Sequence, residues 1–135
     1  MEILKNNSLK EKIKEVVLDD NTNLNDINKT VDIGDAFTIN TDKFTASNKR
    51  CLRYGNIIQI LIQGKLLEAA TAGVKIATSS IDFPYQQWGV SRVTSSPTWF
   101  GTWIQSGDDT IWIEPPSGGS IPADTLIQVE FTVIL

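Results

Sequence analysis

The chain contains no histidine, and this absence excludes more chemistry than any other feature of its composition. Histidine is the commonest general base, belongs to most catalytic triads and is a frequent ligand of zinc and other transition metals. We therefore expect a protein that is not an enzyme, holds no metal and needs no cofactor.

Paired carboxylates are the remaining route to catalysis, because a glycosidase needs an acid and a base at a fixed separation. The sequence offers six candidates but no motif that singles out a pair among Asp82, Asp108, Asp109, Glu114, Asp124 and Glu130. Catalysis is the weaker hypothesis, and we predict no catalytic residues.

Cysteine and long apolar runs are also scarce. The one cysteine, Cys51, cannot form an intramolecular disulfide, and we expect it to be buried as a small hydrophobic residue. No apolar run is long enough to cross a bilayer, and lysines interrupt the amino-terminal stretch MEILKNNSLKEKIKEVV, where a secretory signal would need an apolar core. We expect no membrane insertion and no signal peptide.

Basic residues are outnumbered by acidic ones, 12 to 16, which gives a net charge of -4. Binding to nucleic acid needs a concentrated basic surface, whereas the lysines near the amino terminus alternate with acids. Nucleic acid is therefore not an expected partner.

A chain of 135 residues is long enough for one hydrophobic core with an appendage.

The appendage is predicted to be a helical stem over residues 1–33. Its start is marked by the capping box Ser8-Leu9-Lys10-Glu11, in which serine and glutamate satisfy free backbone N–H groups. Asp20 interrupts the apolar stripe that follows, whose heptad members are Ile13, Val17, Leu24, Ile27 and Val31. We favour self-association through this stripe, and packing onto the following domain is the alternative.

The second zone, residues 34–135, changes to short apolar runs broken by turn residues. Such spacing, without a helical period, predicts an antiparallel β-sandwich or jelly-roll-like head. The predicted strands are residues 36–39, 50–54, 56–66, 74–78, 89–94, 98–105, 110–114 and 126–134.

Within the strand at residues 56–66, residues of two kinds alternate. Ile58, Ile60 and Ile62 fall on one face of the sheet, and the opposite face carries Leu61 between two glutamines. The isoleucine face is predicted to form the core. Exposure of a leucine side chain to water is unfavourable, so we predict that Leu61 lies at a subunit contact.

Four tryptophans fall in the last third of the chain. Trp99 and Trp103 share one face of their strand, and Trp112 points outward if its neighbours Ile111 and Ile113 point inward. An outward indole needs cover. For Trp112 the alternatives, in order of preference, are a subunit interface, stacking on a ligand and packing within the chain.

Further candidate ligand residues are Trp88, Tyr85, Arg92 and Asp108. Trp88, expected on a loop, could stack on the C–H face of a sugar, although a tryptophan that covers the core is equally consistent. Arg92 either faces solvent or meets an acid across a subunit contact. Asp108 could bind sugar hydroxyls or calcium, but Ser-Gly-Asp-Asp is typical of a hairpin turn, which we prefer.

Two short motifs follow one another in the second zone. RYGNI at residues 53–57 opens one strand, and IAT at residues 76–78 runs into Phe83-Pro84. This order resembles the carboxy-terminal heads of tail-fibre and receptor-binding proteins from phages of Gram-positive bacteria. In those heads an R-x-G-N-hydrophobic strand precedes a corner of phenylalanine or tyrosine, arginine and proline. The corner here lacks the arginine, and the resemblance covers residues 44–135.

The resemblance implies a homotrimer with a helical stem and β-sandwich heads that bind host cell-surface or cell-wall saccharides. It also implies a place in the phage virion, in contact with other tail or baseplate proteins. Two alternatives remain open: a structural tail or baseplate component without glycan binding, and a stand-alone carbohydrate-binding module.

Overall fold

A computed structural model of the chain describes residues 29–135. Of the five stem residues on the predicted apolar stripe, four lie outside the described residues: Ile13, Val17, Leu24 and Ile27. In the part of the chain that is described, no helix is long and apolar enough to span a membrane.

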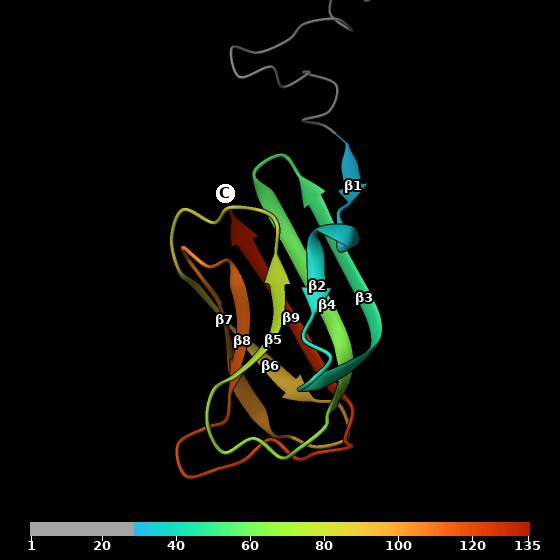
Figure 1. Cartoon of the computed structure of the whole chain (residues 1–135), viewed down its shortest axis with the longest axis vertical. Helices are drawn as coiled ribbons and strands as arrows, with labels where there is room; N and C mark the ends of the chain where they lie inside the picture. Colours follow the sequence, from blue (N-terminus) through green and yellow to red (C-terminus); the bar gives the residue numbers. More distant parts are fainter. Residues whose placement is uncertain (1–28) are drawn as a thin grey trace, which may run out of the picture.

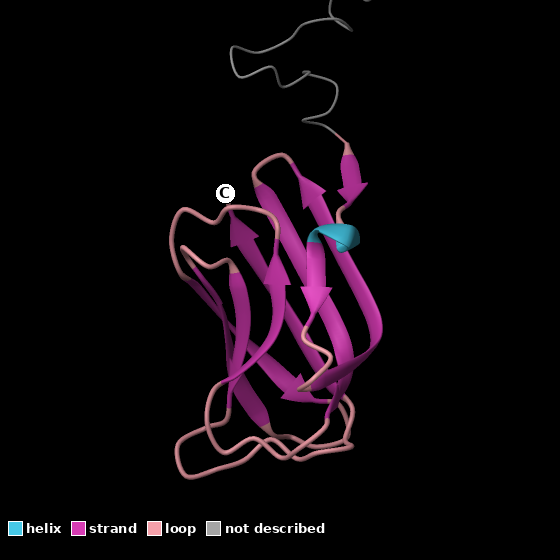
Figure 2. Cartoon of the chain, in the orientation of Figure 1, coloured by secondary structure: helices cyan, strands magenta, loops and turns pink. Residues whose placement is uncertain are grey.

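The described chain is mainly β (Figure 2). Its nine strands form one sheet in the order β1-β3-β4-β9-β6-β7-β8-β5-β2, and every pair of neighbouring strands is antiparallel. A short 3-10 turn, η1 (Gly34–Ala36), precedes β2. The strands are β1 (Thr30–Asp32), β2 (Phe37–Ile39), β3 (Phe44–Tyr54), β4 (Ile57–Leu66), β5 (Val74–Ser79), β6 (Gln87–Val93), β7 (Trp99–Gln105), β8 (Thr110–Glu114) and β9 (Ile127–Ile134).

The sheet curls so that its two ends approach each other (Figure 1). β2 is the last strand of one end and β3 is the second strand of the other, yet the Lys49 ammonium in β3 donates a hydrogen bond to the Phe37 carbonyl in β2 at 2.6 Å. The predicted antiparallel β architecture is confirmed as this curled sheet. All eight predicted strands are present, and β8 has the predicted bounds.

Two segments near the start of the described chain differ from the prediction. β3 begins at Phe44 and not at Arg50, because the polar run that follows Phe44 pairs with β4 on either side of a bulge between Ala46 and Asn48. β1 lies where the helical stem was predicted to end: Thr30–Asp32 pairs with the end of β3, so the stem prediction is wrong for these three residues. Val31 is an exposed residue of this edge strand and not a member of a helical stripe.

Alternation along the strands separates the core from the outer face. Ile58, Ile60 and Ile62 are fully buried, as predicted, and so is Cys51. β9 contributes a second buried set at every other position, and burial of this continuous apolar area is the main stabilising contribution to the fold. Its buried members are Ile127, Val129, Phe131 and Val133.

β9 lies between β4 and β6 and joins the two halves of the sheet. It pairs with β4 along its whole length, from Gly64↔Ile127 to Ile57↔Ile134. With β6 it forms backbone pairs only at Arg92↔Gln128 and Val93↔Ile127. Beyond these pairs, side chains replace the backbone ladder, so the two strands separate.

Two side chains of β6 bridge the separated strands. The Ser91 hydroxyl accepts from the Glu130 N–H at 3.2 Å, and the Gln87 amide both accepts from the Ile134 N–H and donates to the Ile134 carbonyl at 2.7 Å. Between them Phe131 fills the space at Gly89, where a Cβ atom would lie 2.6 Å from the Phe131 Cβ.

Gly64 allows Phe44 to cross the inner face of β4. A Cβ at this position would overlap the Thr45 carbonyl oxygen and lie 2.5 Å from the Phe44 ring. We expect Gly64→Ala to lower the free energy of unfolding by roughly 2–3 kcal/mol, because overpacking forces a backbone shift. Denaturant unfolding measures it. The matched control is Gly101→Ala, whose Cβ would approach only the Glu114 carbonyl oxygen, at 3.8 Å; equal losses for the two variants would contradict this account.

Burial raises the pKa of the Cys51 thiol from 9.0 to about 11. Because the folded-state pKa is the higher one, the unfolded chain loses this proton first, and stability is lost as the pH rises from about 9 to about 11. We measure the free energy of unfolding in denaturant at pH 8 and at pH 10.5. Between these two pH values, Cys51→Ala should lose less of this free energy than the unaltered chain does. Equal pH dependence would overturn the assignment.

Candidate functional site

Three tryptophans form a row across the outer face of β6, β7 and β8. Cross-strand pairing places Trp88 opposite Trp103 and Trp103 opposite Trp112. The ring centroids of Trp88 and Trp103 are 4.8 Å apart with a 30° tilt, and those of Trp103 and Trp112 are 5.8 Å apart and nearly parallel, at 6°. We call Trp88, Trp103 and Trp112 the tryptophan row.

The Trp112 end of the row is held in place from two sides. Its indole N–H donates to the Thr110 hydroxyl at 2.8 Å, and that hydroxyl donates to the Asp108 carboxylate at 2.8 Å. The Lys75 ammonium lies 6.0 Å from the Trp112 ring centroid, at the outer limit of a cation–π contact. Trp112 is half-buried, and Trp103 and Lys75 cover it in part within the chain.

The same outer face carries an exposed apolar strip. Trp88 is 61% exposed, Val90 64% and Trp99 57%. Val90 lies between Trp88 and Arg92 on one face of β6, and Trp99 pairs across the strands with Arg92. Contiguous exposed apolar surface of this kind marks a place where a ligand or another protein binds.

A hollow of about 240 Å³, the Arg92 hollow, adjoins this strip. It lies beside Arg92↔Gln128, the last backbone pair of β6 and β9, and side chains of both strands and Trp99 line it. Two hydrogen bonds fix the Gln128 amide in the wall of this hollow. The Gln63 amide donates to Gln128 at 3.0 Å, and the Gln128 amide donates to the Glu130 carboxylate at 2.7 Å. The lining residues are Val90, Ser91, Arg92, Trp99, Gln128 and Glu130.

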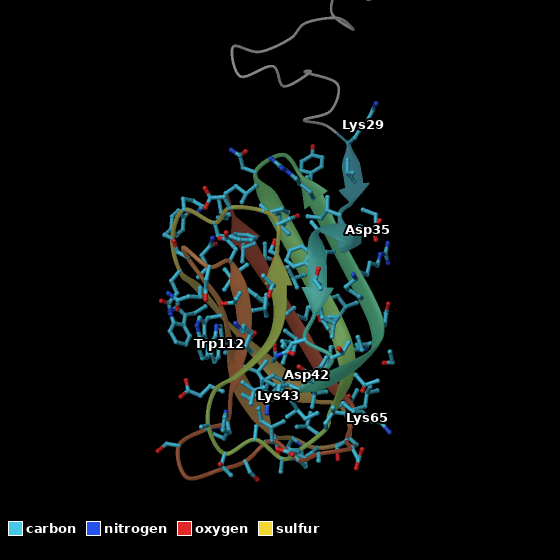
Figure 3. All side chains as sticks on the ribbon, in the orientation of Figure 1. Lys29, Asp35, Asp42, Lys43, Lys65 and Trp112 are labelled. Carbon is cyan, nitrogen blue, oxygen red and sulfur yellow. The ribbon has the colours of Figure 1, made fainter. Side chains whose placement is uncertain are left out.

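A second hollow, of about 360 Å³, lies at the other end of the tryptophan row. Trp112 and Lys75 form part of its wall, and the turn between β2 and β3 and the loop between β4 and β5 complete it. Figure 3 labels three of its residues, Asp42, Lys43 and Trp112. We call it the Trp112 hollow.

The predicted ligand residues are distributed around this face. Trp88 and Trp112 belong to one row, and Arg92 lies on the same face. Trp88 was expected on a loop and is in fact a residue of β6, because its cross-strand pair with Trp103 extends the hairpin. Tyr85 lies in the loop before β6 and is half exposed, and Asp108 lies in the turn between β7 and β8.

Leu61, predicted at a subunit contact, is half-buried on the outer face of β4. Its cross-strand neighbours are Arg50 in β3 and Glu130 in β9. The aliphatic parts of such long charged side chains can cover part of a neighbouring leucine.

Sequence reasoning missed the central role of Trp103 and the positions of Lys75, Gln128 and Glu130. The signal for Trp103 was present in the turn: a four-residue connection over residues 106–109 sets Gln105 opposite Thr110, and therefore Trp103 opposite Trp112. The other three residues come from strands far apart in the sequence, and no local pattern places them here.

Within residues 29–135, no three or more histidine, cysteine, aspartate or glutamate side chains gather as metal ligands. Comparison with known protein families, curated proteins and solved structures finds no match to this chain.

The stacking of the row predicts an energetic coupling. In a double-mutant cycle, Trp103→Leu and Trp112→Leu should couple by about 0.5–1.5 kcal/mol in the free energy of unfolding, because stacked rings attract beyond their buried area. The control cycle pairs Trp99→Leu with Trp112→Leu, whose rings make no contact in the described structure. A coupling in the control as large as in the first cycle would contradict this interpretation.

Proposed function

We propose that this chain is a phage tail or baseplate receptor-binding protein that attaches to host cell-surface or cell-wall saccharides. The observation that carries the proposal is the exposed apolar strip of Trp88, Val90 and Trp99 beside the polar Arg92 hollow. The phage context rests on the resemblance of the strand motifs over residues 44–135, and the virion is accordingly the proposed location.

The chemistry of the face suits a sugar. A pyranose has an apolar C–H face, which packs on a flat indole, and a rim of hydroxyl groups, each of which both donates and accepts hydrogen bonds. Trp99 provides the indole. Arg92 donates hydrogen bonds, Glu130 accepts them, and the Gln128 amide does both. The hollow can therefore bind a sugar hydroxyl that donates a hydrogen bond and one that accepts it.

Binding in this hollow requires little rearrangement. Gln128 is already held by hydrogen bonds from Gln63 and to Glu130, and Trp99 is a residue of a strand and not of a mobile loop. A preformed site loses less conformational entropy when the ligand binds. In the proposal the face binds and holds a saccharide, and no bond of the saccharide is broken.

The finer architecture belongs to the same proposal. The curled sheet is the β-sandwich or jelly-roll-like head, and the residues before β1 contribute the stem that assembles three chains. The end of the sheet nearest the predicted stem supports a subunit contact there: Tyr54, Ile57 and Ile134 are neighbours across β3, β4 and β9, and each is about half exposed. Leu61 extends this outer surface along β4.

An exposed apolar strip is also consistent with a structural tail component, in which another protein would cover the tryptophans. A stand-alone carbohydrate-binding module would use the same hollow as a monomer. Saccharide binding separates the proposal from the first alternative, and oligomeric state separates it from the second.

The binding test uses Trp99→Ala. We expect this variant to lose saccharide affinity by about tenfold or more, because an aromatic stacking partner is removed, with little change in melting temperature since Trp99 is largely exposed. Binding is measured by calorimetry with cell-wall polysaccharide from Gram-positive bacteria. Val31→Ala, which truncates an apolar side chain that is 47% exposed on edge strand β1, is the control. Unchanged affinity in Trp99→Ala would overturn the assignment of the site.

The assembly test is light scattering behind a sizing column. The full chain should elute with three times the chain mass, and Ile13→Asp with Val17→Asp should convert it to a monomer, because charges in an apolar seam prevent helix association. A monomeric unaltered chain at micromolar concentration would contradict the trimer and favour the stand-alone module.

A further inference from the structure

The Trp112 hollow has the size and lining of a ligand site. Its volume of about 360 Å³ lies within the roughly 300–1,000 Å³ that small-ligand sites occupy, whereas the Arg92 hollow is smaller. Its apolar side chains come from the end of β4, the following loop and β5. They are Leu66, Leu67, Ala69 and Val74.

The hollow adjoins the tryptophan row directly. Gly73, in the loop before β5, lies against two indoles, because a Cβ at that position would be 3.5 Å from Trp103 and 3.7 Å from Trp112. The Trp112 ring in turn is fixed by its hydrogen bond to Thr110. The wall of the hollow is therefore continuous with the face that binds saccharide in the proposed function.

The rim of the hollow carries charges of both signs in equal number. Asp42 and Glu68 supply two carboxylates, and Lys43 and Lys75 supply two ammonium groups. Lys75 lies over Trp112, whereas Asp42, Lys43 and Glu68 are exposed, and their side chains make no hydrogen bond or ion pair with another residue of the described range. These charged ends are free to bind a ligand.

Asn40 adds a fixed amide to the lining. Its amide N–H group donates to the Lys75 carbonyl at 3.0 Å, which orients the side chain and leaves the amide oxygen as an acceptor. Together with the rim, the hollow thus offers three acceptors and two cationic donors around an apolar floor.

We propose that the Trp112 hollow is a second saccharide subsite, selective for a neutral, unsubstituted hexose unit with adjacent hydroxyl groups. Each hydroxyl can donate to a carboxylate and accept from an ammonium group, and such charge-assisted hydrogen bonds are stronger than neutral ones. The C–H face of the sugar lies on the apolar floor. This inference rests on the proposed saccharide-binding function and adds the place and class of a second sugar unit.

The balanced rim gives a charged sugar no advantage. A carboxylate on the sugar would be attracted by Lys43 and Lys75 but repelled by Asp42 and Glu68, and an ammonium group would meet the reverse arrangement. In both cases the ion would also lose part of its hydration on entering the hollow.

The test compares three sugars of one ring configuration: galactose, galacturonate and galactosamine, which are neutral, negative and positive at neutral pH. Amide resonances of the full chain are followed by NMR during titration with each sugar. We expect galactose to shift the resonances of Lys43, Glu68 and Gly73 and to bind about threefold tighter than either charged sugar, since exposed charge pairs contribute little.

A charge-altered variant tests the cause of the selectivity. Asp42→Asn with Glu68→Gln leaves two lysines unopposed, so the preference should reverse, and galacturonate should then bind about threefold tighter than galactose in the same hollow. Both positions are exposed, and the fold should be unaffected. A galactose preference that persists in this variant would overturn the role of the rim.

Failure of this inference is distinguishable from failure of the proposed function. The second subsite is wrong if none of the three sugars shifts resonances of the Trp112 hollow, or if a charged sugar binds the unaltered chain best. In either case the main site would still stand if Trp99→Ala loses polysaccharide binding. If the polysaccharide does not bind either, both proposals fail.

Discussion

The position of β9 between β4 and β6 is the constraint on which the rest of the structure depends. Its inward residues complete the core that the isoleucines of β4 begin, and its pairs with β6 connect the two halves of the curled sheet. The connection to β6 is short, because Phe131 occupies the space at Gly89 and side chains take over from the backbone ladder. The Arg92 hollow lies beside the last of these pairs, and its lining includes both paired residues, Arg92 and Gln128.

The described residues include no histidine and no cluster of metal ligands, so the chemistry of the outer face comes from its indoles and its charged and amide side chains. Indoles in register stack across β6, β7 and β8, and the row ends at Trp88, a largely exposed ring, on one side and at a hollow with a balanced charged rim on the other. Apolar planes beside groups that donate and accept hydrogen bonds match the two-sided chemistry of sugars. A trimer would present three copies of this face, and linked copies increase avidity without new contacts.

The strands and their faces were predictable from the sequence, because a period of two is a local signal. This period correctly predicted that Ile58 faces inward and Trp112 outward, and it predicted the bounds that β8 has in the structure. The first half of β3 was missed since its polar residues lack that period, and β1 is too short to show one. The two hollows were not predictable, because they unite residues as distant as Asp42 and Trp112, or Arg92 and Glu130, through long-range pairing that no local pattern encodes.

The proposed binding of saccharide beside the tryptophan row is best tested by an NMR titration of the four indole N–H resonances with a soluble cell-wall oligosaccharide. We expect the resonances of Trp99 and Trp88, the two most exposed indoles, to shift with a common dissociation constant. We also expect a smaller change at Trp103, which is stacked between two rings. Saturable oligosaccharide binding that leaves all four indole resonances unmoved would place the sugar elsewhere and overturn the proposed site.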